Sequence, residues 1–131
     1  MHTSIYAGFC GLMMCWLALQ TIKVRRANKV RLGDGGIPAL QAAIRAHGNF
    51  AEYMPIVLIL LFLLEYNGLN VIVIHVIGIA FLAGRYLHAK GILTDDLRYR
   101  VRGMGFTLAI LLGLAIANIL LAGFKIFKQF V

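Results

Sequence analysis

The stretch from Gln41 to Pro55, QAAIRAHGNFAEYMP, decides the fold because it places ionisable side chains at the start of a long apolar segment. At about 100° per helical residue, its polar side chains share one sector of roughly 100°. These are Arg45, Asn49, Glu52 and Tyr53, with Gln41 at the edge. The residues that follow, Met54 to Leu64, are apolar without interruption, so this face continues into membrane hydrocarbon. Ionisable groups are costly there, and they indicate a functional site.

The composition is typical of an integral membrane protein. Of the 131 residues, 61% are hydrophobic, and the mean hydropathy is +0.85, whereas soluble domains are about half apolar. The length suits four helices of about 20 residues each with short connections. No linker rich in Pro, Ser or Gly divides the chain. We therefore predict an all-α membrane protein, a bundle of four transmembrane helices that forms a single domain over residues 1–131.

The charges and cysteines argue against other classes of protein. The formal net charge is +8, but the basic residues stand in short segments beside apolar runs and form no soluble face for nucleic acid. Cys10 and Cys15 lie about 140° apart around a helix, so they cannot pair with each other. No spacing typical of a metal site occurs, and we expect no metal.

Four apolar segments follow one another along the chain. The first runs from Ser4 to Ile22 and lacks the basic start of a signal peptide, so we expect it to be retained. The second helix is expected from about Pro38 to Glu65, and Pro55 inside it should bend it. The third is expected from about Val71 to Lys90, and the fourth apolar span covers Phe106 to Gly123.

The connections between these segments differ in charge. The first connection and the adjoining helix ends carry Lys23, Arg25, Arg26, Lys29, Arg31 and Arg45. The third carries Lys90, Arg98, Arg100 and Arg102, whereas the second, Glu65 to Asn70, carries no basic residue. The positive-inside rule then places the first and third connections in the cytoplasm and both termini on the opposite side. Lys125 and Lys128 near the C-terminus are the minor exception.

The polar residues that are the strongest candidates for a ligand site lie near the predicted cytoplasmic face. They are the polar face of the second helix, Arg85 and His88 late in the third, and the arginines that open the fourth. Arginines can hold carboxylates through paired hydrogen bonds, while Glu52 can hold an ammonium group, so a small zwitterionic peptide would suit them. The alternative is structural, because Arg45 could reach the interface and pair with Glu52 without any ligand.

The run RAHGNFAEYMP, Arg45 to Pro55, resembles the signature of the MAPEG family, membrane-associated proteins in eicosanoid and glutathione metabolism. Written loosely as R-A-x-x-N-x-x-E-x-x-P, that signature matches at every defined position. The layout extends the resemblance over nearly the whole chain, most closely to small, uncharacterised bacterial members. The resemblance implies a homotrimer with glutathione bound between subunits as cosubstrate. It assigns four residues to glutathione binding: Arg45, Asn49, Glu52 and Tyr53.

Two further segments resemble the family's glutathione contacts. The run KVRRANKV resembles an arginine pair at the end of helix one, which implies that Arg25 or Arg26 reaches a glutathione carboxylate from a neighbouring subunit. Both could instead set the membrane topology and anchor the helix to lipid headgroups. The run GRYLHAKG is similar to R-x-x-Y-x-x-G-Y at Arg85 and Gly91, with His88 in place of the first tyrosine. Arg85 and His88 are therefore assigned to the site, His88 as a proton-handling group or a plain interfacial histidine.

The start of the fourth helix supplies the catalytic candidate. The segment R-x-x-x-x-T-L-A from Arg102 to Ala109 resembles the region around the family's catalytic arginine. A thiol with a pKa of about 8.5 is mostly protonated at neutral pH, and an adjacent cation stabilises the nucleophilic thiolate. We therefore predict Arg102 as the catalytic residue. Arg98 or Arg100 could take its place, and a purely topological charge is the other alternative.

These resemblances favour a glutathione transferase that conjugates glutathione to lipophilic electrophiles entering from the lipid bilayer. Peroxide reduction by the same thiolate is a related activity. The sequence contains no Ser-His-Asp set, phosphate loop or haem motif, so the nucleophile would come from the cosubstrate. One alternative is a non-catalytic lipid-binding or scaffold member of the family. Another is a small four-helix drug/proton antiporter, which would carry its carboxylate in the first helix, where this chain has none.

Overall fold

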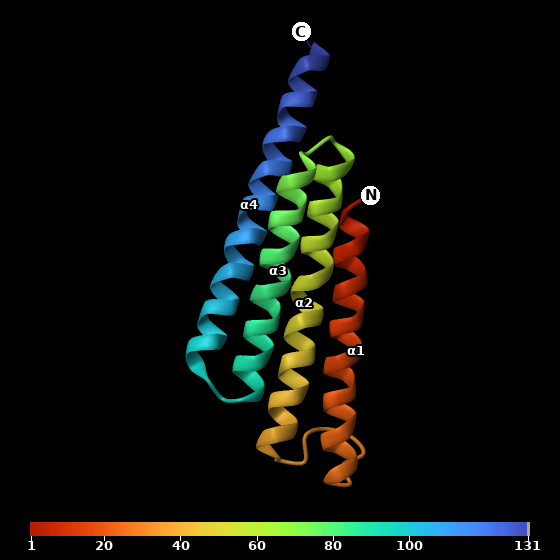
Figure 1. Cartoon of the computed structure of the whole chain (residues 1–131), viewed down its shortest axis with the longest axis vertical. Helices are drawn as coiled ribbons and strands as arrows, with labels where there is room; N and C mark the ends of the chain where they lie inside the picture. Colours follow the sequence, from red (N-terminus) through yellow and green to blue (C-terminus); the bar gives the residue numbers. More distant parts are fainter. Residues whose placement is uncertain (131) are drawn as a thin grey trace.

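The computed structural model describes residues 1–130, and Val131, the last residue of the predicted domain, lies outside them. The described chain folds into α1 Thr3–Ala27, α2 Pro38–Tyr66, α3 Val71–Leu93 and α4 Leu97–Phe130. Neighbouring helices run in alternate directions and form an elongated bundle (Figure 1). Each helix is long and apolar enough to cross a membrane. The prediction of an all-α bundle with four membrane-spanning helices is therefore confirmed.

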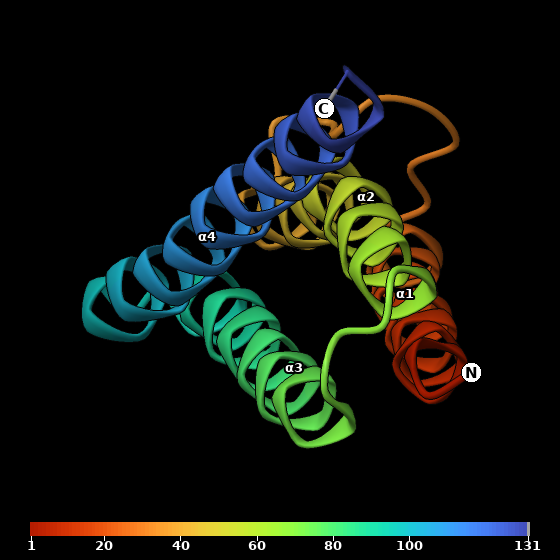
Figure 2. The same cartoon turned by 90° about the horizontal axis from the view of Figure 1, so that it is seen from above.

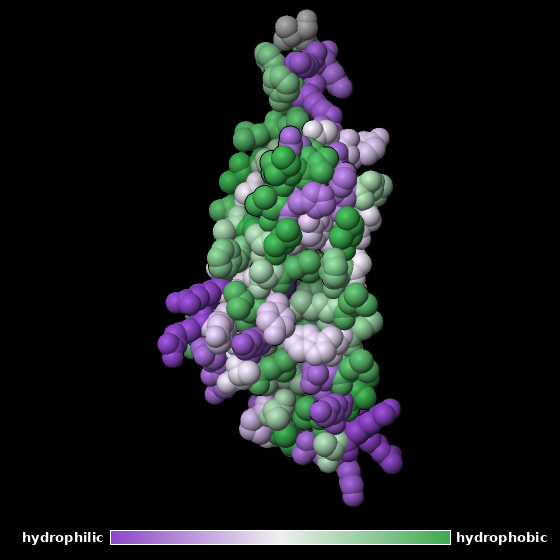
Figure 3. Space-filling view, in the orientation of Figure 1, coloured by the Kyte–Doolittle hydropathy of each residue, from purple (hydrophilic) through white to green (hydrophobic). Residues whose placement is uncertain are grey.

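The outer surface of the bundle is apolar. Large apolar side chains are exposed on every helix, including Leu12, Ile59, Ile79 and Leu112. They form a broad hydrophobic region in the middle of the molecule, and hydrophilic residues gather near the ends (Figure 3). Such a surface suits a bilayer, because contact between apolar side chains and lipid tails costs no free energy. The protein is therefore an integral membrane protein.

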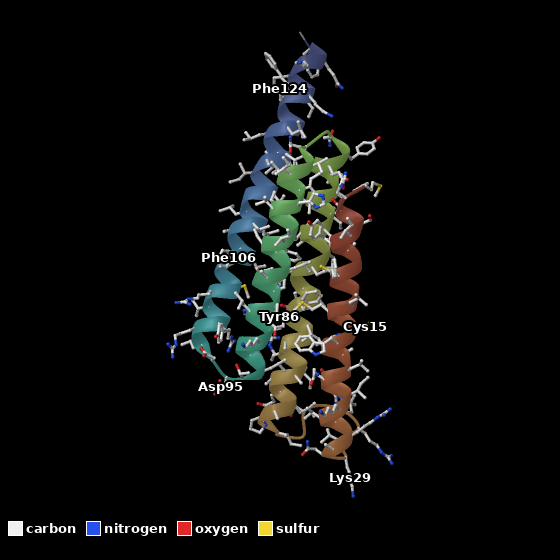
Figure 4. The ribbon with its side chains drawn as sticks, viewed as in Figure 1. Cys15, Lys29, Tyr86, Asp95, Phe106 and Phe124 are labelled. Carbon is white, nitrogen blue, oxygen red and sulfur yellow. The ribbon has the colours of Figure 1, made fainter. Side chains whose placement is uncertain are left out.

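The two basic connections lie at the same end of the bundle. The α1–α2 and α3–α4 connections share that end, while the α2–α3 turn, the N-terminus and the end of α4 lie toward the other (Figure 1). Lys29 and Asp95 mark the basic end in Figure 4, and Phe124 lies at the opposite end. This grouping agrees with the predicted topology. Which end faces the cytoplasm stays a prediction.

Two helices extend beyond the limits expected from hydropathy. Helix α1 continues past Ile22 to Ala27, with Arg25 and Arg26 in its last turn. Cations there stabilise the helix, because its final carbonyl groups carry partial negative charge. Lys23, Arg25 and Arg26 therefore stand on the end of the helix, and the connection begins after them.

Helix α4 is also longer than its apolar span. It starts at Leu97, where the side chain of Asp96 accepts a hydrogen bond from the Arg98 backbone at 2.9 Å. This carboxylate satisfies a free N–H of the first turn. The arginines expected in the third connection therefore stand on the helix itself. The tail with Lys125 and Lys128 is helical as far as Phe130.

Helices α3 and α4 touch through their backbones near their connection. A Cβ atom on Gly103 would lie 2.4 Å from the His88 backbone nitrogen, and one on Gly91 would lie 2.3 Å from that of Arg100. Small residues allow this approach between membrane helices. The two helices diverge toward the opposite end (Figure 2). The glycines therefore fix which residues of α3 and α4 face each other.

The opposite end is held by polar contacts between helices. Glu65 of α2 accepts hydrogen bonds from the backbone N–H groups of His2 and Thr3, the latter at 2.8 Å. The Tyr6 hydroxyl lies 2.7 Å from Nδ1 of His75. We call this group, with residues His2, Thr3, Tyr6, Glu65 and His75, the N-terminal clasp. His75 therefore joins α3 to α1.

Two smaller features involve single polar or sulfur-containing side chains. Asn118 of α4 donates a hydrogen bond to the Leu60 carbonyl of α2 at 3.0 Å and so joins two helices. Cys10 and Cys15 are both free thiols, the first buried and the second exposed.

Candidate functional site

A pocket lies near the basic end, between helices α2, α3 and α4. Its volume is about 270 Å³. Its wall is formed by Arg45, Asn49, His88, Ile92, Leu97, Arg100, Val101 and Met104. Three of these residues, Arg45, Asn49 and His88, were predicted for a ligand site from the sequence. We call this the basic pocket.

The basic pocket combines positive charge with an apolar wall. Arg45 and Asn49 stand one turn apart on α2, so they project toward the same side. Arg100 of α4 supplies a second guanidinium, and no carboxylate lines the wall. Arg45 has a carboxylate 4.0 Å away in Glu52, which lies outside the wall, whereas Arg100 has no ion pair among residues 1–130. The positive charge favours an anionic ligand, and the remaining residues suit an apolar one. The pocket can therefore hold a molecule with both characters.

Arg85 lies in the core next to the pocket wall. Its side chain has 0% exposure, and one guanidinium nitrogen donates to Oδ1 of Asn49 at 2.6 Å. Its guanidinium carbon lies 5.5 Å from the ring centre of Tyr53 and 5.8 Å from that of Phe50. The amide oxygen and the aromatic faces replace part of its lost hydration. In this structure Arg85 supports the wall and does not form part of it.

Arg85 also determines what Asn49 offers to the pocket. A guanidinium only donates hydrogen bonds, so the atom of Asn49 that faces it must be the carbonyl oxygen. The amide NH₂ group of Asn49 is then left as a donor. Among residues 1–130, no carboxylate lies within ion-pair distance of Arg85. Its uncompensated charge adds to the positive potential of the basic pocket.

His88 lies on the pocket wall with its ring held from one side. Nδ1 lies 2.8 Å from the backbone carbonyl oxygen of Arg100, and the residue is only 3% exposed. The contact is possible because Gly103 brings the α4 backbone against His88. The sequence indicates neither this hydrogen bond nor the close approach of the helices.

Glu52 and Tyr53 do not line the basic pocket, although they share a helix with Arg45 and Asn49. A nitrogen of Arg45 lies 4.0 Å from a carboxylate oxygen of Glu52, and the side chains are 65% and 55% exposed. This pair agrees with the structural alternative for these residues, but both belong to α2, so it joins no two helices. The ring of Tyr53 faces Arg85 instead. A direct contact between either residue and glutathione stays a prediction.

Arg25 and Arg26 lie at the end of α1, away from the basic pocket. Arg25 donates to the carbonyl oxygen of Gly33 at 2.6 Å and so holds the α1–α2 connection. In the same connection, the Gly36 backbone N–H donates to Asp34 and lowers the pKa of that carboxyl. Arg26 is exposed. Their predicted contact with a ligand in a neighbouring subunit stays a prediction.

Arg102, the predicted catalytic residue, lies on another side of α4. It borders a small polar depression with Asp96, Arg98 and Tyr99, outside the basic pocket. Residues two apart on a helix point about 200° apart, so Arg100 and Arg102 cannot both face the pocket. The spacing to Gly103, which contacts α3, would have indicated that Arg100 takes this position. Whether Arg102 acts in catalysis stays a prediction.

Comparison with known proteins agrees with this architecture. A sequence model of the MAPEG family matches residues 3–120, from the start of α1 well into α4. The chain belongs to the MAPEG family. Two curated relatives are both called inner membrane protein YecN, from Escherichia coli strain K12 and strain O6:H1. Each is 37% identical over 119 residues, which cover 91% of this chain and 91% of the relative.

The comparison confirms two of the sequence-based interpretations. The resemblance to small bacterial MAPEG proteins is confirmed, because the YecN relatives match along almost their whole length. The chain is an integral inner-membrane protein, as its four membrane-spanning helices and these relatives indicate. The residues that line the basic pocket all fall within the matched range.

Proposed function

We propose that this MAPEG protein is a membrane-bound glutathione transferase that conjugates glutathione to lipophilic electrophiles. The observation that supports this most is the basic pocket, where two guanidinium groups and an amide donor face a wall without carboxylates. Glutathione carries two carboxylates and a thiol that becomes an anion when it reacts. The pocket cations stabilise each of these anionic groups, whereas a neutral ligand would leave Arg100, which has no ion pair among residues 1–130, without a counter-ion.

The second substrate would come from the lipid bilayer. Leu97 and Val101 line the basic pocket and are 70% and 60% exposed on the outer face of α4. A lipophilic electrophile dissolved in the membrane can therefore reach the pocket without crossing water. Peroxide reduction would use the same route and the same thiolate, with a lipid peroxide in place of the electrophile.

A cation beside the sulfur would make the thiol reactive. At an effective dielectric constant of about 20 and a separation of about 4 Å, a guanidinium attracts a thiolate by about 4 kcal/mol. Solvent screening reduces this value, because Arg100 is exposed to solvent. A smaller attraction is still sufficient, since about 1.4 kcal/mol changes a thiol pKa by one unit. Within one chain, Arg100 is the residue that the pocket geometry favours for this role.

We also propose that the site is completed by a neighbouring subunit in a homotrimer. The cavity of about 270 Å³ is slightly smaller than the ~300–1,000 Å³ typical of ligand pockets. Residues assigned to glutathione by resemblance, Arg26 and Glu52, are exposed outside it. Arg102 is exposed as well. A second subunit against this end of the bundle would bring such groups to the ligand.

The test compares Arg100→Ala with Arg102→Ala in the purified protein. The variant that lacks the activating cation should bind glutathione but form less thiolate at neutral pH, because the thiol pKa returns toward its ordinary value. Turnover should then fall about tenfold for each unit of pKa shift and recover in part at alkaline pH. Thiolate absorbance, calorimetric binding and conjugation of 1-chloro-2,4-dinitrobenzene measure these effects.

The outcome also distinguishes the two forms of the site. A loss in Arg100→Ala alone supports the pocket of a single chain, and a loss in Arg102→Ala alone supports a site between subunits. A wild-type protein that neither binds glutathione nor forms the conjugate would contradict the proposed function.

The second candidate is a non-catalytic member of the family that binds lipid or acts as a scaffold. The position of Arg102 outside the basic pocket favours it, because the resemblance assigns thiolate activation to that residue. Such a protein would retain the fold and the pocket without turnover. Glutathione binding with no conjugation, in the wild type and in both variants, would support this candidate.

A further inference from the structure

We infer that His88 is the general base that removes the proton from the thiol bound in the basic pocket and returns it to the product. This inference rests on the proposed function and adds a step to it. Arginine stabilises a thiolate but cannot accept its proton, because it stays protonated at all ordinary pH values. A conjugating enzyme therefore benefits from a second group that exchanges protons. His88 is the titratable residue on the pocket wall other than the arginines.

The hydrogen bond to Arg100 fixes the tautomer of His88. A backbone carbonyl oxygen can only accept, so the Nδ1 atom that lies 2.8 Å from it must carry a hydrogen. In a neutral imidazole the other nitrogen, Nε2, then has no hydrogen and presents a lone pair. The structure therefore holds neutral His88 in the form that accepts a proton at Nε2.

The glycine contact between α3 and α4 keeps this arrangement in place. The site of a Cβ on Gly103 is 2.4 Å from the His88 backbone nitrogen and 2.5 Å from the Gly84 carbonyl oxygen. Backbone atoms packed so closely allow little change in the register of the two helices. The carbonyl of Arg100 therefore stays opposite Nδ1, and the ring cannot turn without loss of this bond.

Nε2 has no hydrogen-bond partner among residues 1–130. It is also not one of the fully buried polar atoms without a partner, which in the described chain are Thr3 Oγ1 and Arg85 Nε. Some access to Nε2 therefore remains, even though His88 as a whole is 3% exposed. Because His88 lines the basic pocket, this access is from the pocket.

The charged groups around His88 favour proton transfer from a bound thiol. Arg85 lies one turn away on α3, while Arg45 from α2 and Arg100 from α4 line the same pocket. These cations oppose a lasting imidazolium in the empty pocket. A thiolate formed beside them compensates the added charge, so the proton can move to Nε2 when the thiol is bound.

When glutathione adds to an activated alkene, the proton that leaves the sulfur ends on the product. Nε2 accepts the hydrogen from sulfur while a sulfur electron pair forms the C–S bond at the β-carbon. The π electrons of the alkene move toward the carbonyl group and give an enolate. The imidazolium then donates its Nε2 proton to the α-carbon, and neutral His88 is restored. No oxidant, reductant or further reactant takes part.

The variant His88→Asn tests this role. The amide nitrogen of asparagine can replace Nδ1 as a donor to the Arg100 carbonyl, whereas nothing replaces Nε2. With a long-chain 2-alkenal as the electrophile, we expect kcat to fall about 10²-fold, the usual scale of general acid–base catalysis. Glutathione affinity measured by calorimetry should change little. His47→Asn, a variant of a half-buried histidine outside the pocket, is the matched control and should keep full turnover.

Two further measurements separate a base from a structural residue. Added imidazole should restore turnover to His88→Ala, because a small base can enter the space that the ring leaves. In the wild type, nitrogen NMR of labelled histidine should show Nδ1 protonated and Nε2 unprotonated for His88. The opposite tautomer would overturn the inference even if glutathione is bound.

The failure of this inference differs from the failure of the proposed function. An active wild type with equal turnover in His88→Asn across the pH range would overturn the role of His88 alone. A wild type that does not form the conjugate would overturn both.

Discussion

The two ends of the bundle use polar residues in different ways. In the N-terminal clasp, both oxygens of Glu65 accept backbone N–H groups and the Tyr6 hydroxyl is bonded to His75. In the basic pocket, Arg45 and Arg100 face a cavity that contains no carboxylate. The side chains of Glu65, Tyr6 and His75 in the clasp thus have partners within the chain, whereas among residues 1–130 the guanidinium of Arg100 and Nε2 of His88 in the pocket have none.

This difference explains why position in a membrane helix does not by itself identify a functional residue. His75 and His88 both stand on α3, and each forms a hydrogen bond through Nδ1. His75 bonds to a side chain of α1 that packs on Gly78, so its role is to join helices. His88 bonds to a backbone carbonyl and lines a cavity, so its second nitrogen stays available.

Gly103→Ala should have the largest effect, because it disturbs the helix contact on which the pocket depends. The added Cβ meets backbone atoms at 2.4 and 2.5 Å, which cannot move as a side chain would. We expect a loss of about 3 kcal/mol or more in the free energy of unfolding, at the upper end of overpacking costs. Denaturant titration in bicelles measures this loss, together with the loss of glutathione binding.

Gly105→Ala is the matched control for that experiment. No heavy atom lies within 4 Å of the Cβ it would add, although it stands only two residues further along α4. It should unfold with unchanged or slightly higher stability, since alanine favours helices over glycine. Equal destabilisation by both variants would show that the effect arises within α4 and not from its contact with α3.

Arg45→Ala should have the next largest effect, and it concerns only the pocket. Loss of a charged hydrogen bond to a ligand carboxylate should weaken glutathione binding by about 1 to 3 kcal/mol. Glu52→Gln should cost less than about 1 kcal/mol, because Glu52 is exposed and its pair with Arg45 is weak. Calorimetry measures both, while the unfolding free energy should stay near that of the wild type. An equal loss in Glu52→Gln would indicate that this carboxylate binds the ligand directly.

Tyr6→Phe should have the smallest effect, and it concerns only the clasp. It removes the hydroxyl that lies 2.7 Å from His75 while the ring can still pack on Gly78. Hydrogen bonds between membrane helices are worth about 0.6 kcal/mol on average, so the unfolding free energy should fall by about that amount. Glutathione binding and turnover should be unchanged. A loss of turnover would show that the two ends are coupled, contrary to the comparison above.

The sequence by itself determined the membrane location, the four helices, the end at which basic residues gather, and the family. Hydropathy and charge are sums over neighbouring residues, so they can be read along the chain. The signature from Arg45 to Pro55 is likewise local, because its residues project from successive turns of α2.

The tertiary structure alone decided which polar groups face the pocket. The sequence favoured Arg102, yet Arg100 lines the wall, and Arg85 lies fully buried against Asn49. These positions depend on the rotation of α4 about its axis, which is fixed where Gly91 and Gly103 let its backbone meet α3. Such a contact joins residues from two helices, and hydropathy along one helix contains no information about it. The contact between α3 and α4 also leaves Nε2 of His88 free, because a backbone carbonyl of α4 is hydrogen-bonded to Nδ1.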